Sequence, residues 1–267
     1  MRRYVRPSGA VWRRVLVTVA GTAALLVGLQ GSAFAASPAG HLAGGRLPFG
    51  ISERAYTALW WQWALGAPIH DPPYTGPIVN PLFDPTGAAC STDQMGPVWF
   101  LAGQESPGTV TRSCLVPAGE YLFFPLINIE ADNIGVVPPL TPQQWRPLVR
   151  QAVDATTELH LSIDGTALPE GELFRHRAAS PIFSYTLPPE DNVAQSFGED
   201  AKGFIFPVVS DGYWIMLKPL SIGDHVIEFG GTVGTFSLDV TYHLTVLPAP
   251  DARPGGIAGE IGHFRMA

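Results

Sequence analysis

The sequence is poor in positive charge and lacks the familiar catalytic signatures. Only two of its 267 residues are lysines, Lys202 and Lys218, and lysine and arginine together number 16 against 23 acidic residues. A formal net charge of −7 repels phosphate backbones, so we expect no nucleic-acid partner. The chain has no Gly-x-Ser-x-Gly, His-Glu-x-x-His or Cys-x-x-Cys motif, no phosphate-binding glycine loop, and no His-x-His pair. These absences argue against familiar hydrolases and zinc enzymes, but they do not exclude an enzyme.

Residues 1–35 have the pattern of a secretory signal peptide. An uncharged stretch at 15–29 ends before Ala33-Phe34-Ala35 and follows five basic residues, Arg2, Arg3, Arg6, Arg13 and Arg14. The stretch is shorter than the roughly 20 residues needed to span a membrane, which favours cleavage over anchoring. Loss of 35 residues leaves 232, with 11 basic against 23 acidic side chains and a net charge of −12. Export by the general or the twin-arginine route stays open. No membrane-length apolar run follows.

The two cysteines, Cys90 and Cys114, form an even pair in a chain expected to be exported. A disulfide is therefore predicted, and closing that loop is worth about 3 kcal/mol on the chain-entropy model. A catalytic thiol is the alternative, against which the oxidising compartment argues.

The elements read along the chain predict a mainly β protein. Abundant glycine and proline (29 and 26), about ten short strands and no β-α-β alternation favour an antiparallel β-sandwich, jelly-roll or immunoglobulin-like, with two short helices. Ser52 and Thr141 are the expected caps of those helices. Residues 204–218 are predicted to form a hairpin that turns at Ser210-Asp211-Gly212. The expected organisation is a flexible leader at 36–50, a single domain at 51–247 and a disordered tail at 248–267.

The apolar segment from Leu122 to Asp132 is predicted to be a strand around which the rest of the chain is organised. Alternation would place one set of side chains on one face: Leu122, Phe124, Leu126, Asn128, Glu130 and Asp132. The opposite face would then carry Phe123, Pro125, Ile127 and Ile129. Pro125 within the strand indicates an edge position or a bulge.

The polar end of this strand is the main candidate site. Asn128, Glu130 and Asp132 are the candidate calcium ligands, although residues about 7 Å apart would have to be brought together by a bend. Calcium is the only cofactor considered, and none is required. Glu130 and Asp132 are also candidate catalytic carboxyls, because glycosidases separate such a pair by about 5–9.5 Å. The alternative is a solvated strand end whose carboxylates cap nearby amides.

Further candidates for ligand binding are Trp61, Asn128, Asp211 and His243. Tyr56, Leu59, Trp60 and Trp63 share one helical stripe and are expected in the core, whereas Trp61 faces elsewhere. Asp211 and His243 are single polar residues whose partners the sequence does not show.

Several sequence blocks carry a resemblance: Trp60-Trp61-Gln62-Trp63, residues 96–103, Val116-Pro117-Ala118-Gly119 with the following Phe-Phe-Pro, Asp211-Gly212-Tyr213-Trp214 and Asp239-Val240-Thr241-Tyr242. Together they resemble a group of predicted exported bacterial proteins of unassigned function, over about residues 50–247. The resemblance implies export from a bacterium and supplies no site residues.

Three functions follow from these features. The first is an exported, non-catalytic binding module for an extracellular glycan or similar small ligand, which rests on fold-level analogy. The second is a secreted polysaccharide-active enzyme with an acidic site, with or without the assistance of calcium, and the third is a structural envelope protein. Clustering of Trp61, Glu130, Asp132 and the 188–203 loop around one concave pocket would favour the enzyme, and a flat aromatic strip would favour binding. The sequence indicates no oligomeric state.

Overall fold

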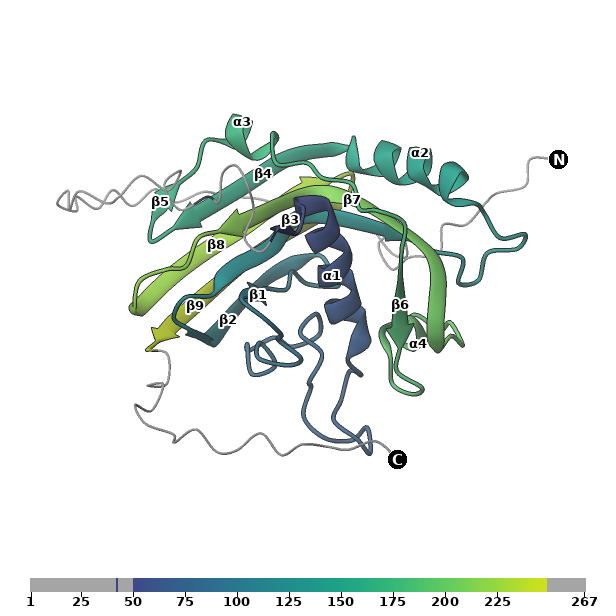
Figure 1. The fold of residues 1–267 in the computed structure, drawn as a ribbon, viewed down its shortest axis with the longest axis horizontal. Coiled ribbons are helices and arrows are strands. Elements are labelled where there is room, and N and C mark those ends of the chain that lie inside the picture. The colour runs from purple at the N-terminus through teal and green to yellow at the C-terminus, as the bar shows by residue number, and fades with distance from the viewer. Residues whose placement is uncertain (1–41, 43–49, 249–267) are drawn as a thin grey trace, which may run out of the picture.

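The structure, a computed structural model, describes Leu42 and residues 50–248. The expected signal peptide, most of the leader and all but the first residue of the expected tail therefore lie outside the described residues. Leu42 forms an isolated antiparallel bridge with Leu217 and packs against the core. The described strands form two sheets, as predicted for a mainly β protein (Figure 1).

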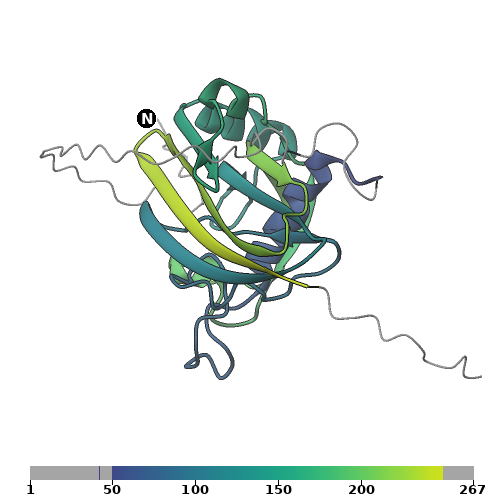
Figure 2. The ribbon, with the colours of Figure 1, turned by 90° about the vertical axis from the view of Figure 1, so that its left-hand side faces the viewer.

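One sheet has four strands in the order β1 (Val98–Phe100), β3 (Tyr121–Ala131), β7 (Gly203–Leu217) and β6 (Phe183–Leu187). The other has five, in the order β2 (Gly108–Pro117), β9 (Phe236–Leu247), β8 (Gly223–Val233), β4 (Thr156–Ile163) and β5 (Thr166–Ala167). Figure 2 shows the curvature of β2 and β9, which lie side by side. The helices are α1 (Glu53–Gly66), α2 (Pro142–Val153) and two single turns, α3 (Glu170–Leu173) and α4 (Val193–Ser196).

The expected all-antiparallel pairing is wrong for two strand pairs. β1 pairs with β3 in parallel, and β2 pairs with β9 in parallel, while the remaining pairs are antiparallel. The reason is the path of the chain: after β1 it crosses to the other sheet for β2 and returns for β3. Two crossings bring the chain back beside β1 in its original direction, so the short β1 strand runs parallel to its neighbour.

Two apolar cores flank the four-stranded sheet. The inter-sheet core contains Phe124 and Ile129 of β3, Phe229 of β8, and Trp145 of α2. The helix-side core lies on the opposite face of the sheet, where α1 crosses the strands, and contains Tyr56, Trp60 and Trp63 of α1 packed against sheet residues such as Phe123 and Trp214 (Figure 1). The rings of Phe123 and Trp214 stack with centroids 5.3 Å apart.

The helix predictions are confirmed at their caps. Ser52 accepts a hydrogen bond from the Ala55 amide at the start of α1. Thr141 and Gln144 form a reciprocal capping box at α2. Tyr56, Trp60 and Trp63 are buried as expected, but Leu59 is 38% exposed, because its side of α1 faces outward.

A bulge in β3 overturns the predicted division of its faces. The pairing of β3 with β7 shifts register between Pro125 and Ile127, so the predicted bulge exists. Leu126 and Ile127, although consecutive, both pack in the inter-sheet core. The extra residue reverses the alternation beyond this point. Asn128, Glu130 and Asp132 therefore lie on the face of Phe123, toward α1, and not on the face of Leu122 and Phe124.

The predicted hairpin at 204–218 is also wrong, because Gly203–Leu217 is one continuous strand. Asp211 and Gly212 sit in its middle, opposite Ile129 and Asn128 of β3. A Cβ atom on Gly212 would lie 2.6 Å from the backbone oxygen of Ile127. The glycine thus permits a close approach of two strands beside the bulge rather than a turn.

The predicted disulfide between Cys90 and Cys114 is confirmed, with Cα atoms 5.9 Å apart. It ties the loop before β1 to β2 of the other sheet. Such a bond fits a protein that folds outside the reducing cytosol. Within residues 50–248, no helix has the length and apolar character that crossing a bilayer demands.

Candidate functional site

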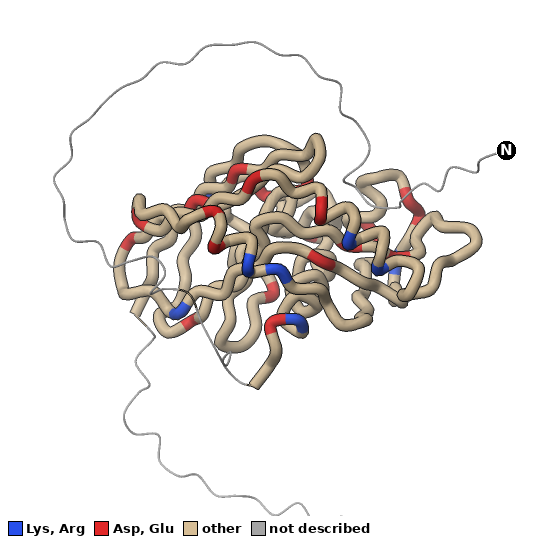
Figure 3. Tube along the Cα trace, turned by 90° about the horizontal axis from the view of Figure 1, so that it is seen from above, with Lys and Arg blue, Asp and Glu red and all other residues tan. Residues whose placement is uncertain are grey.

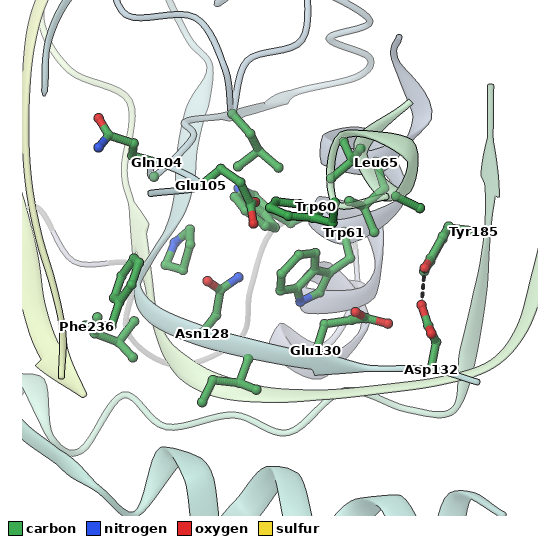
Figure 4. Close-up of a pocket in the computed structure, with 18 of the residues that line it drawn as sticks. Trp60, Trp61, Leu65, Gln104, Glu105, Asn128, Glu130, Asp132, Tyr185 and Phe236 are labelled. Atoms are coloured by element: carbon green, nitrogen blue, oxygen red, sulfur yellow. Dashed lines mark hydrogen bonds between the residues drawn. The ribbon is translucent and has the colours of Figure 1, made fainter. Parts of the chain in front are cut away.

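A cavity of about 280 Å³ lies between α1, β3 and the segment that follows β1 (Figure 4). Much of its wall is apolar or aromatic, from residues such as Leu65, Leu187 and Phe236. Its polar lining side chains come from five separate parts of the chain: Trp61, Gln104, Glu105, Asn128, Glu130, Asp132, Tyr185 and Glu199. A mostly apolar cavity with a few convergent polar groups is typical of a small-molecule site.

Four of the predicted site residues meet in this cavity. Trp61 enters from α1, Asn128 and Glu130 enter from β3 beyond the bulge, and Asp132 directly follows β3. The 188–203 segment contributes a further wall through Val193, Ala194, Phe197 and Glu199. The helix and the strand are each anchored in the helix-side core, so the cavity is held by rigid elements.

The other two predicted ligand-binding residues lie elsewhere. Asp211 is buried in an ion pair, with an oxygen 2.8 Å from Nη2 of Arg177, which also pairs with Asp154. His243 is exposed on β9. Neither side chain lines the cavity, because both project from faces of the sheets that α1 does not cover.

Asp132 and Glu130 form a hydrogen-bonded carboxyl pair. Asp132 is 4% exposed and accepts hydrogen bonds from the Tyr185 hydroxyl and from the Ile134 amide, the latter at 2.7 Å. A further hydrogen bond joins it to Glu130. Figure 4 shows Tyr185 and Asp132 pointing toward each other at one end of the cavity. The pair is thus one connected unit rather than two separate acids.

Burial is the main reason why this pair retains a proton. Desolvation raises the pKa of Glu130 well above its usual value, and the nearby charges of Asp132 and Glu105 raise it further. Burial also raises the pKa of Asp132, against which the hydrogen bonds from Tyr185 and Ile134 act. We therefore assign the proton to Glu130, which donates it to Asp132, whose charge is stabilised by the hydrogen bonds from Tyr185 and Ile134. Burial and the neighbouring carboxylates raise the pKa of Tyr185, so it stays a hydrogen-bond donor.

Glu105 is a third carboxyl group of the cavity. It is half-buried in the connection between β1 and β2, and Figure 4 shows it pointing into the cavity across from Asn128. Burial raises its pKa to about 8, so at neutral pH much of it is protonated. The sequence did not single out Glu105, Tyr185 or Glu199 as site residues. Their segments were predicted only as a turn, a core strand and a polar loop, respectively.

Three polar atoms in the cavity are buried without a hydrogen-bond partner among the described residues. They are the indole nitrogen of Trp61, the amide nitrogen Nδ2 of Asn128 and Oε1 of Glu130. Leaving one such group unpaired costs about 1–3 kcal/mol. Two donors and one carboxyl oxygen in the same cavity are a polar pattern that a bound molecule with matching groups would satisfy.

The calcium site stays a prediction. No group of three or more His, Cys, Asp or Glu side chains suited to a metal ion occurs within the described ranges. Calcium takes six to eight oxygen ligands, whereas the Glu130–Asp132 pair is engaged in its own hydrogen bonds. The arrangement fits proton sharing better than ion coordination.

Ser221, His225 and Asp164 have the order of a nucleophile triad but lie outside the cavity. Nδ1 of His225 is 2.8 Å from Asp164, and Nε2 is 3.2 Å from the Ser221 hydroxyl. Nε2 is closer still, at 2.9 Å, to the backbone oxygen of Ser221, to which it must donate. A nitrogen that donates cannot take the serine proton, so these residues join two turns rather than form a catalytic triad.

Comparison of the chain with protein-family models, curated proteins and solved structures finds no match. The chemistry of the cavity is therefore the basis for assigning a function.

Proposed function

We propose that this chain is an exported enzyme that binds a small, hydroxylated, non-anionic ligand in the cavity between α1 and β3. The Glu130–Asp132 pair acts as its general acid and base. The observation that carries this proposal is the pair itself, buried beside unpartnered donors of Trp61 and Asn128. Trp61, Glu130, Asp132 and the 188–203 loop line one concave cavity, which favours an enzyme over a flat binding strip.

Stability gives no reason for this arrangement. Two interacting carboxyl groups in a poorly solvated place disfavour the folded state once they ionise, as do unpaired buried donors. A core of apolar side chains would fill the same space at less cost. Strongly perturbed carboxyls in a cavity are typical of sites whose chemistry needs them.

The proposed reaction is proton transfer on the bound ligand. The ionised oxygen of the pair removes one proton from the ligand, and the protonated member delivers one proton to another ligand atom. The pair thus ends with one proton, as it began, and no oxidant or reductant is needed. Tyr185 keeps Asp132 oriented throughout, because its hydroxyl remains a donor.

The size and lining of the cavity define the ligand class. A volume of about 280 Å³ is at the lower end for small-molecule sites, so it suits one sugar-sized unit rather than a polysaccharide chain. A hydrogen-bonded pair is also closer together than the 5–9.5 Å of glycosidase carboxyls. Among the described lining residues none is Lys, Arg or His, which disfavours an anion. Aromatic walls and two free N–H donors suit a hydroxylated molecule.

The remaining features fit a secreted protein. We place the cavity on a two-sheet β scaffold of jelly-roll or immunoglobulin-like type, exported by the signal peptide and held by one disulfide. A second candidate function is binding without turnover. It is favoured by the hydrogen bonds that Asp132 accepts from Tyr185 and Ile134, which would let the pair serve as a fixed anchor.

The test is a screen of the purified mature chain against small sugars, polyols and their amine derivatives. Binding is followed by ligand-observed NMR and turnover by mass spectrometry. We expect a compound that is bound and converted, and loss of conversion by at least 100-fold with retained binding in Glu130→Gln. The control is Glu190→Gln, an exposed glutamate outside the cavity. Binding without conversion by the parent chain would favour the second function, and no binding of any compound would overturn both.

A further inference from the structure

We propose that the ligand carries a positive charge, and specifically that it is an amine-bearing polyol such as an amino sugar. This inference rests on the proposed function, because it names the ligand class of the same cavity. It follows from the charges that line the cavity, from the aromatic rings beside them and from the atoms left without partners.

The lining has four carboxyl groups and, in the part of the chain that the structure describes, no basic side chain. Glu105 enters after β1, Glu130 and Asp132 enter from the end of β3 and the residue that follows it, and Glu199 enters after α4. No described lining residue is Lys, Arg or His. Carboxyl groups removed from water are ordinarily paired with a cation or a metal, and the described lining residues include no cation for Glu105, Glu130 or Glu199. A positive group on the ligand would complete the site.

Two tryptophan rings line the same cavity as these carboxyl groups. Trp60 and Trp61 pack edge to face with ring centroids 5.1 Å apart. The indole nitrogen of Trp60 already donates a hydrogen bond to the backbone oxygen of Leu101. Trp61 is half-buried, and Figure 4 shows its ring between Glu105 and Glu130. An ammonium group over an indole face is attracted by the ring electrons, and tryptophan is the best such partner.

The unpartnered atoms require more than a simple cation. Oε1 of Glu130 can accept an N–H from an ammonium group. The nitrogens of Trp61 and Asn128 are donors and need oxygen acceptors on the ligand. A bare metal ion or a hydrocarbon amine would leave these donors unpaired. A molecule with both an amine and hydroxyl groups satisfies all three.

When no ligand is bound, bound protons neutralise part of the negative charge of the carboxyl groups in the cavity. Burial holds Glu105 and Glu130 partly protonated, and the charges of Asp132 and Glu105 raise the pKa of Glu130 further. The other titratable groups facing the cavity are Asp132, Tyr185 and Glu199. An arriving ammonium group favours the charged carboxylates and so releases protons. The charge of the rest of the described chain is also mainly negative, because acidic positions outnumber basic ones along it (Figure 3).

The experiment compares three related sugars at pH 6.5: D-glucosamine, D-glucose, which matches it in size, and N-acetyl-D-glucosamine, which keeps the nitrogen in a larger, uncharged group. Calorimetry in two buffers of different ionisation enthalpy measures affinity and proton release together. We expect glucosamine to bind at least tenfold more tightly than the other two, and to release protons that glucose does not. In Glu105→Gln the preference for the amine should fall to threefold or less, while Glu190→Gln should keep it.

The outcomes separate this inference from the proposed function. If glucose binds and is converted as well as glucosamine, the inference is overturned and the enzyme proposal stands. If glucosamine binds preferentially but is never converted, the inference stands and the enzyme proposal fails. If none of the probes binds, both are overturned.

Discussion

The hydroxyl group of Tyr185 donates a hydrogen bond to the carboxylate of Asp132, which joins the edge strand β6 to the end of β3. This bond stabilises the charged form of Asp132 and opposes the effect of burial on its pKa. It also fixes which member of the pair with Glu130 carries the proton.

Tyr185→Phe should therefore raise the pKa of Asp132. Without the donor, the charged carboxylate loses stabilisation while its burial is unchanged, so protonation persists to higher pH. The measurement is a ¹³C NMR titration of the aspartate carboxyl groups. Tyr213→Phe is the matched control, because Tyr213 lies beside Arg177 and outside the cavity. An Asp132 titration that is the same in Tyr185→Phe and in the parent chain would contradict this role.

The stability of the ligand-free protein should fall as the pH rises from about 4.5 to about 8. Burial raises the pKa of Glu105 from 4.5 to about 8, so the folded state binds a proton more tightly than the unfolded state does. The folding contribution is thus present below pH 4.5 and is lost as the pH rises through 8. Glu130 acts in the same direction.

Glu105→Gln tests this dependence. Glutamine cannot ionise, so at pH 8 the variant should gain on the order of 2 kcal/mol in unfolding free energy relative to the parent chain, and little at pH 4.5. Urea denaturation at both pH values measures the difference, with Glu190→Gln as the control. Equal pH dependence in the parent and in Glu105→Gln would show that this carboxyl is solvated.

Removal of the Cys90–Cys114 bond should lower the unfolding free energy by about 3 kcal/mol. The bond closes a loop between residues 24 apart in sequence, and opening it returns entropy to the unfolded chain. Denaturation of the double variant Cys90→Ala/Cys114→Ala measures the loss. Dithiothreitol should destabilise the parent to the same degree and leave the double variant unchanged. Two free thiols in the untreated protein would refute the bond.

Local patterns were enough to predict part of this fold. Ser52, Thr141 and the cysteine pair each depend on chemistry contained within a few residues or on a single pairing. Alternation placed Asn128, Glu130 and Asp132 on a common face correctly. It could not show which face, because a bulge at Pro125 reverses the phase and only the pairing with β7 reveals its position.

The cavity was only half predictable for a related reason. Trp61, Glu130 and Asp132 stood out as aromatic or acidic residues, but Glu105 and Tyr185 reach them only through the strand order β1-β3-β7-β6. The pair Asp211-Gly212 led to the wrong prediction of a hairpin, because an Asp-Gly pair ordinarily favours a turn. Here the Asp211 carboxylate forms an ion pair with Arg177, and Gly212 permits a close contact between two strands. Tertiary structure therefore overrides the local preference for a turn.

That contact gives a further prediction, in which Gly212→Ala displaces the part of β3 from which Asn128 enters the cavity. The new methyl group would meet the Ile127 oxygen at 2.6 Å and Cα of Asn128 at 2.7 Å, both backbone atoms that cannot turn aside. The strands must separate, which should destabilise the fold by about 2–3 kcal/mol and shift the backbone NMR signals of Asn128 and Glu130.

Gly66→Ala is the matched control, because a methyl group there meets no atom within 4 Å at the end of α1. This variant should be as stable as the parent or slightly more so, since alanine is the better helix former. Urea denaturation of both variants, with amide spectra of β3, measures the contrast. If Gly212→Ala proved as stable as Gly66→Ala, with the β3 signals in place, the close pairing of Gly212 with Asn128 would be wrong. The register of β3 with β7 beyond the bulge, which turns Asn128 and Glu130 toward α1, would then be wrong as well.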